Sequence, residues 1–119
     1  GKPLIIYGDG EQTRDYQYID DAIEGYILSE HLPAGQIINT GFGIDHKIID
    51  IAKTIIEICN SKSTIVFDEP RVGEVHKLRS NIDKIKGFGF TPQYTLREGL
   101  EAYIAWLQKY DLDSLGVMK

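Results

Sequence analysis

Residues 3–26, PLIIYGDGEQTRDYQYIDDAIEGY, carry the pattern that decides the fold of this chain. The apolar, β-branched run Pro3–Tyr7 predicts a strand, and Gly8-Asp9-Gly10 predicts the turn that ends it. The alternating segment Asp15–Ile19 predicts a short second strand. A helix is expected over Asp20–His31, where the first aspartate offers a side-chain oxygen as the N-cap. Strand, turn and helix so close together indicate mixed α and β structure.

The remaining residues continue this alternation. We expect strands at Gln36–Thr40 and Thr64–Phe67, a helix at about Lys47–Cys59, a polar loop at Asp68–Ser80, a helical turn or two at Ile82–Lys86 and a last helix from Thr95. The last helix begins with a capping box, because Thr95 and Glu98 can each satisfy an amide of the other. The expected fold class is α/β (mixed), with residues 1–119 as one region and residues 111–119 as a flexible tail.

Composition and charge exclude several classes of function. The chain has 119 residues, 42% of them hydrophobic and 26% charged, which is typical of one globular domain or part of a larger one. Lys plus Arg is 13 and Asp plus Glu is 18, so the net charge of −5 argues against a nucleic-acid partner or an anionic membrane surface. Cys59 is the only cysteine, which excludes an intrachain disulfide and favours the reducing cytoplasm.

Two charged loops are candidate ligand-binding segments. The glycine loop, Gly8–Asp15 (GDGEQTRD), permits close backbone approach and ends with Arg14, so its amides and guanidinium could bind a phosphate. The arginine loop, Asp68–Glu74 (DEPRVGE), offers Arg71 for a phosphate and Glu74 for ribose hydroxyls. Ordinary turn chemistry explains both loops as well, with a surface ion pair between Arg14 and the next residue in the first.

No catalytic set stands out. A dinucleotide fingerprint needs G-x-G-x-x-G, and Gly8-Asp9-Gly10 and Gly41-Phe42-Gly43 both lack the third glycine. No tyrosine has a lysine four residues later, and the three histidines share no metal-ligand spacing. Cys59 lies on an apolar helical stripe, which favours a core position. We therefore expect no catalytic, cofactor-binding or metal-binding residue here.

Three motifs, in order, resemble the C-terminal part of the extended short-chain dehydrogenase/reductases, the NAD-dependent sugar-nucleotide epimerases and dehydratases that include the UDP-glucose 4-epimerases. The segment Gly8–Asp21 matches the family pattern G-x-G-x-x-x-R-D-[YF]-x-[YH]-[VI]-x-D, and Ile38–Gly43 (INTGFG) matches N-x-G-x-G. Residues 69–110 match an R-x-G-[ED] loop followed by a capped final helix. Lys47 stands where this family usually has Ser or Thr, and Val72 where it often has Pro.

The resemblance implies roles for four residues in a nucleoside-diphosphate site. It implies that Arg14 and Arg71 clamp the diphosphate, that Glu74 accepts a ribose hydroxyl, and that Tyr16 packs near the nucleotide loop. The substrate would be a UDP- or dTDP-sugar. NAD and a catalytic Tyr-x-x-x-Lys pair would belong to an N-terminal part outside these residues, so we expect no NAD bound to this chain and no activity of the chain alone. The parent enzyme would be a homodimer.

Several alternatives remain open. The resemblance slightly favours an epimerase, but a dTDP- or GDP-sugar 4,6-dehydratase fits the same motifs. A stand-alone, non-catalytic nucleotide-sugar-binding module and a domain that kept only the fold are further possibilities. If the chain is a C-terminal piece, the resemblance also implies that apolar side chains of the first helix and of the Gln36–Thr40 strand are uncovered, which would promote self-association. The side chains concerned are Ile23, Ile27, Ile37 and Ile38.

Overall fold

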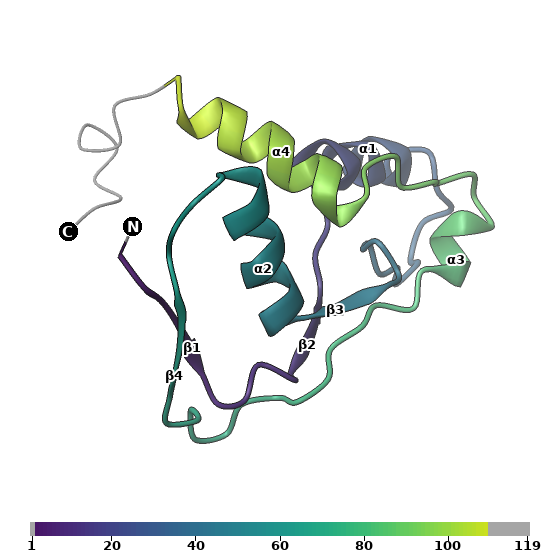
Figure 1. The fold of residues 1–119 in the computed structure, drawn as a ribbon. Coiled ribbons are helices and arrows are strands. Elements are labelled where there is room, and N and C mark those ends of the chain that lie inside the picture. Colours follow the sequence, from purple (N-terminus) through teal and green to yellow (C-terminus); the bar gives the residue numbers. More distant parts are fainter. Residues whose placement is uncertain (1, 110–119) are drawn as a thin grey trace.

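The computed structural model describes residues 2–109, which form four strands and four helices mixed along the chain (Figure 1). The strands are β1 (Leu4–Tyr7), β2 (Thr13–Asp15), β3 (Asp45–Lys47) and β4 (Ile65–Asp68), and the helices are α1 (Ile19–Ser29), α2 (Ile48–Ile58), α3 (Asp83–Lys86) and α4 (Leu96–Leu107). The predicted mixed α/β class is confirmed. The predicted tail at 111–119 lies outside the described residues.

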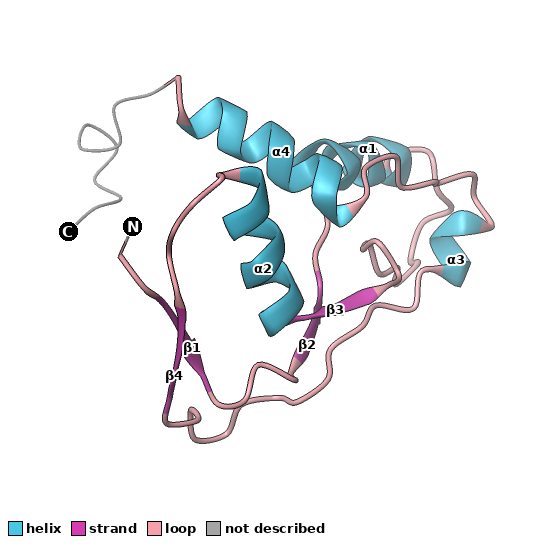
Figure 2. Ribbon diagram, in the orientation of Figure 1, coloured by secondary structure: helices cyan, strands magenta, loops and turns pink. Residues whose placement is uncertain are grey.

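The strands form two small sheets (Figure 2). Strands β1 and β4 pair in parallel, from Leu4 opposite Ile65 to Tyr7 opposite Asp68. Strands β2 and β3 pair antiparallel. Parallel strands are normally covered on both faces, yet Phe67 is 53% exposed. The described residues therefore leave part of the β1–β4 sheet uncovered.

Two expectations about strands need correction, and one further strand was not predicted. Residues Gln36–Thr40 form no strand within the described part of the chain, because no neighbouring segment there pairs with them. The second strand is Thr13–Asp15 rather than Asp15–Ile19, since the antiparallel pairing with β3 stops at Asp15. Strand β3 itself was not predicted, because its three residues give too short a pattern to recognise without the partner strand.

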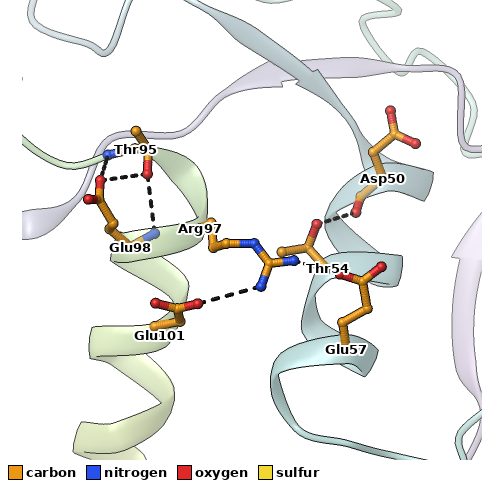
Figure 3. A network of polar contacts seen from close by, with 7 residues as sticks. All are labelled: Asp50, Thr54, Glu57, Thr95, Arg97, Glu98 and Glu101. Carbon is orange, nitrogen blue, oxygen red and sulfur yellow. Dashed lines mark hydrogen bonds and ion pairs between the residues drawn. The ribbon is translucent and has the colours of Figure 1, made fainter.

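Most helices lie where the sequence predicts them. Helix α4 begins with the expected capping box: the Glu98 amide donates to Thr95 Oγ1 at 3.3 Å, and the Thr95 amide donates to Glu98 Oε2 at 2.9 Å (Figure 3). Helix α1 differs at its start, because its N-cap is Tyr18 and no side chain caps it. The predicted N-cap, Asp20, lies inside the first turn.

The hydrophobic core is small, with Ile6 of β1 and Ile51 and Ala52 of α2 buried in one part of it and a second part near α3. Ile82, Ile85 and Phe90 form a buried cluster, against which Leu28 and Ile38 pack. Cys59 is exposed at the end of α2, so its predicted core position is wrong. Cys59 is the C-cap residue of α2 and follows the last helical residue, Ile58, so it does not lie on the buried face of the helix.

The expected uncovered apolar surface is largely confirmed. Ile23 is 46% exposed, Ile27 52% and Ile37 87%. Ile38 is the exception, because it packs against the core cluster. The outer face of α1 therefore lacks the covering that an amphipathic helix normally has.

Candidate functional site

An open hollow of about 850 Å³ lies at the carboxyl ends of β1 and β4. We call it the β1–β4 hollow. Its lining comes from the glycine loop (Gly8, Asp9 and Gln12), the arginine loop (Asp68–Arg71 and Glu74), Phe67 and His76. Both loops leave the sheet at the same edge because β1 and β4 are parallel. Ligands of open α/β sheets bind at this edge.

The glycine loop is fixed by backbone geometry. Gly8 and Gly10 both have positive φ, of 79° and 77°, which favours glycine at both positions. A Cβ on Gly10 would lie 2.9 Å from Ile49 Cβ, so the loop packs directly on the start of α2. Lys47 Nζ also contacts Glu11 Oε2 at 2.6 Å, and this hydrogen bond and charge raise the pKa of Lys47. The lysine that departs from the family pattern thus fastens the loop to α2.

Arg14 and Glu74 connect the two loops. Arg14 Nη2 lies 3.0 Å from Glu74 Oε1, and Nη1 donates to the Thr13 carbonyl at 2.8 Å. Both charged side chains are about three-quarters buried, with 23% and 26% exposed. Two of the donors of Arg14 are therefore already engaged.

Arg71 is held differently. Its guanidinium carbon lies 4.4 Å from the centroid of the Tyr7 ring, in a cation–π arrangement. No carboxylate of the described residues forms an ion pair with it. Arg71 and Glu74 line the same hollow, and Arg14 joins them through Glu74.

Tyr16 lies elsewhere. It is 45% exposed and lines a separate, smaller hollow with Leu96, Leu100 and Tyr103 of α4. The structure therefore brings together three of the four predicted site residues and leaves Tyr16 outside the β1–β4 hollow. The alternation of Tyr16 with Tyr18 could not distinguish these two locations.

Asp15 has a structural role that the sequence did not predict. Its Oδ1 accepts the Phe42 amide at 2.9 Å, and its Oδ2 accepts the amides of Gly43 at 2.9 Å and Ser80 at 3.1 Å. The surface ion pair between Arg14 and Asp15, one of the two explanations of the glycine loop, does not form within residues 2–109, where Arg14 pairs with Glu74 instead. Asp15 thus fixes the end of β2, next to Arg14, to two distant segments.

The described structure contains neither a candidate metal-binding cluster nor a candidate membrane-spanning helix. Within residues 2–109, no three or more His, Cys, Asp or Glu side chains are grouped so that they could hold a metal ion. In the same range, no helix combines the length and apolarity needed to cross a bilayer.

Comparison with known proteins identifies relatives over most of this chain, although no family model matches it. The chain is 29% identical over 104 residues to a putative UDP-glucose 4-epimerase from Methanocaldococcus jannaschii, covering 87% of this chain and 34% of that protein. It is 32% identical to UDP-glucuronic acid decarboxylase 1 from Arabidopsis thaliana, covering 87% of this chain and 24% of the decarboxylase.

Solved structures agree with these relatives. A UDP-glucose 4-epimerase from Thermotoga maritima, crystallised with UDP-glucose, superposes with a TM-score of 0.86 at 30% identity, over 90% of this chain and 35% of the epimerase. A dTDP-glucose 4,6-dehydratase from Bacillus anthracis, in complex with NAD, superposes with a TM-score of 0.84 at 26% identity, over 92% and 36%.

The fold and these similarities define a class first: the chain has a mixed α/β fold that matches a C-terminal region of Rossmann-type enzymes. Within this class, the homologues and structural neighbours of the chain are extended short-chain dehydrogenase/reductases, the NAD-dependent sugar-nucleotide epimerases and dehydratases. It spans between a quarter and about a third of the length of the two relatives described.

Proposed function

We propose that the chain is the C-terminal substrate-binding region of an NAD-dependent, UDP-glucose 4-epimerase-like enzyme, and that it binds the nucleoside diphosphate of a UDP-sugar. The observation that carries the proposal is the β1–β4 hollow, which Arg71 and Glu74 line and to which Arg14 is tied by an ion pair. The superposition with an epimerase crystallised with UDP-glucose supports it.

The chemistry of the three side chains suits this ligand. Guanidinium groups remain charged at any working pH and can bind phosphate oxygens through two parallel hydrogen bonds. The ion pair of Glu74 uses only Oε1, so Oε2 remains for a ribose hydroxyl. A bound diphosphate would contact Arg14, which also pairs with Glu74, and would contact Arg71, which has no ion-pair partner within residues 2–109. Tyr16 lies outside this hollow and lines the smaller one beside α4, so our proposal gives it no direct contact with the diphosphate.

The remaining parts of the enzyme would come from elsewhere. This chain has neither the dinucleotide fingerprint nor the Tyr-x-x-x-Lys pair, so its own residues do not fit NAD. An N-terminal NAD-binding part would supply the transient oxidation of the sugar, and the uncovered side chains of β4 and α1 offer surfaces on which it could pack. We further propose a cytoplasmic homodimer as the complete enzyme.

A second candidate has the same binding residues but another reaction. Similarity to a dTDP-glucose 4,6-dehydratase of B. anthracis favours a dTDP-sugar, and a UDP-glucuronic acid decarboxylase is also a relative. The choice among these reactions depends on the part that carries the catalytic residues. A stand-alone binding module would use Arg14, Arg71 and Glu74 in the same way.

The test is calorimetric titration of the full-length enzyme with UDP and dTDP. Arg71→Ala and Arg14→Ala should each weaken binding by about 1.5–3 kcal/mol, because each removes a charge-assisted contact. Arg71→Lys should restore only part of the loss, since lysine lacks the planar fork. The two losses should not simply add, because both arginines contact one diphosphate.

Arg97→Ala provides the matched control, because Arg97 is an arginine on α4 that pairs with Glu57 rather than with the site. Its removal should leave UDP affinity unchanged. If both site variants bind as tightly as the parent, the chain has kept the fold without the ligand and the proposal is wrong.

A further inference from the structure

The two arginines of the site differ in what holds them. Arg14 donates to a carbonyl and to the Glu74 carboxylate, which fix its position and partly neutralise it. The Arg71 side chain has neither kind of partner within residues 2–109, and its guanidinium lies over the ring of Tyr7. A ring face attracts a cation through its quadrupole and accepts no strong hydrogen bond. The N–H donors of Arg71 therefore remain available for an anion.

The arginine loop alone cannot fix the Arg71 side chain. Val72 is fully exposed, and a Cβ on Gly73 would meet no atom within 4 Å. A long side chain on such a loop has many rotamers, and ordering it on binding would reduce affinity. A platform that orders Arg71 before the ligand arrives would avoid that loss.

Tyr7 is well placed to be this platform. It is the last residue of β1 and lies opposite Asp68 in β4. Its carbonyl accepts a 2.8 Å hydrogen bond from Gln12 Nε2, and Gln12 is only 5% exposed. The next residue, Gly8, donates its amide to the Asp68 carbonyl at 2.9 Å. The backbone that carries the ring is thus fixed on both sides, at the edge where the arginine loop begins.

We propose that Tyr7 is a positioning residue of the nucleotide site, whose ring holds Arg71 in the arrangement that binds the diphosphate. This inference rests on the proposed function, because it requires Arg71 to bind the ligand. It assigns to Tyr7 an effect on affinity that acts through the arginine.

A double-mutant cycle in the full-length enzyme tests the proposal. The variants are Tyr7→Phe, Tyr7→Leu, Arg71→Ala and the combination of the last two. The probes are UDP and inorganic pyrophosphate, which has no base or ribose, so any direct contact of Tyr7 with a nucleoside is absent from the second titration. Calorimetry gives the affinity for each probe.

Tyr7→Phe should bind both probes like the parent, because it keeps the ring. Tyr7→Leu should weaken both by about three- to tenfold, in the range of a partly exposed cation–π pair. In the Arg71→Ala background, Tyr7→Leu should have no further effect, because the partner of the ring is gone. A purely structural role of Tyr7 would not produce this dependence on Arg71.

An NMR measurement checks the contact without relying on the folding of Tyr7→Leu. In arginine-labelled enzyme, the Tyr7 ring current should shift the side-chain Hδ resonances of Arg71 upfield, and Tyr7→Phe should keep that shift. Arg71 resonances at random-coil positions would overturn the inference.

Two titration results would also overturn it while leaving the proposed function intact. In the first, Arg71→Ala weakens binding but Tyr7→Leu binds pyrophosphate like the parent. In the second, Tyr7→Leu weakens binding equally with and without Arg71. If Arg71→Ala binds both probes like the parent, Arg71 is no ligand residue, and that result overturns the proposed function together with the inference.

Discussion

The interior of this molecule and its outer surface use charged side chains in different ways. Inside, Asp21 is 2% exposed and accepts the backbone amides of Gln93 at 2.8 Å and Tyr94 at 3.1 Å. Outside, Arg97 of α4 contacts Glu57 of α2 and Glu101 of its own helix, and all three side chains are at least half exposed (Figure 3). The inner carboxylate joins segments more than seventy positions apart, and the outer network joins two helix surfaces.

The two arrangements differ in the conformational entropy that the side chains lose when the contacts form. A backbone amide in a folded segment is already fixed, so a buried carboxylate that accepts it orders only its own side chain. A surface ion pair must order two long side chains, and solvent and salt screen its attraction. We therefore expect the aspartates that accept backbone amides to contribute more to stability than the surface network does.

The largest effect is expected for Asp21→Ala, which would remove the buried carboxylate that accepts the Gln93 and Tyr94 amides. The loss should be about 3 kcal/mol in the free energy of opening near these two residues, because each hydrogen bond to a charged group contributes about 1.5–3 kcal/mol. Hydrogen exchange of these two amides in the full-length enzyme measures it. Asp20→Ala, at the exposed neighbouring position, is the control and should change this free energy by less than about 0.5 kcal/mol. Equal protection in both variants would contradict the expectation.

The next effect is expected for Asp15→Asn, which keeps the shape but replaces one acceptor oxygen by a donor. Asp15 accepts three amides through two oxygens, so either orientation of the new amide leaves at least one donor facing a donor. We expect a loss of about 2 kcal/mol, read from faster exchange of the Phe42, Gly43 and Ser80 amides. Asp50→Asn, on the exposed side of α2, should leave those three amides unchanged. Unaltered exchange in Asp15→Asn would show that the carboxylate charge is not needed there.

A smaller effect is expected for Arg97→Ala, which removes both ion pairs of the surface network. The loss should be below about 1 kcal/mol and should shrink further as salt is added, because both partners are exposed. Amide exchange of α4 at low and high ionic strength provides the measurement. A loss as large as that of Asp21→Ala would erase the contrast between surface and interior.

The same contrast explains which parts of the fold the sequence could predict. Thr95 and Glu98 are three residues apart, so their capping box is a local pattern and its prediction is correct. The partners of Asp15 and Asp21 are backbone amides between 27 and 73 positions away, and an amide has no signature in the sequence. Strand β3 was not predicted, and the strand predicted at Gln36–Thr40 was wrong, for a related reason, since a strand needs a pairing partner that no local sequence pattern identifies.

The candidate site shows the same limit. Arg71 and Glu74 lie in one short loop, so the sequence could predict that they occupy one place. The pairing of Arg14 with Glu74 spans sixty positions, and only the family resemblance suggested that these residues belong together. The sequence did not indicate a role in the site for Tyr7 or Gln12, because one fits a strand pattern and the other a turn. The role of these two residues depends on contacts at the edge of the sheet.

The smallest expected effect is the dependence of α4 on pH through Glu98. The Thr95 hydroxyl donates to Glu98 Oε2 at 2.6 Å, and this bond, with help from the Thr95 amide, holds the pKa of Glu98 below its ordinary value. A carboxylate with a lowered pKa in the folded state stabilises the helix fully above the pKa of the unfolded chain, near 4.3 for glutamate. That contribution is lost as the pH falls through the folded pKa. NMR titration of the Glu98 carboxyl should show the lowered value, and Thr95→Ala should return it toward normal. Thr91→Ala, four residues earlier and exposed, should leave the titration unchanged. If Glu98 instead titrates at its ordinary value in the parent enzyme, the capping box does not stabilise the charged form of this carboxylate. The exposed capping box would then add no pH-dependent stability to α4, in contrast to the buried carboxylate of Asp21.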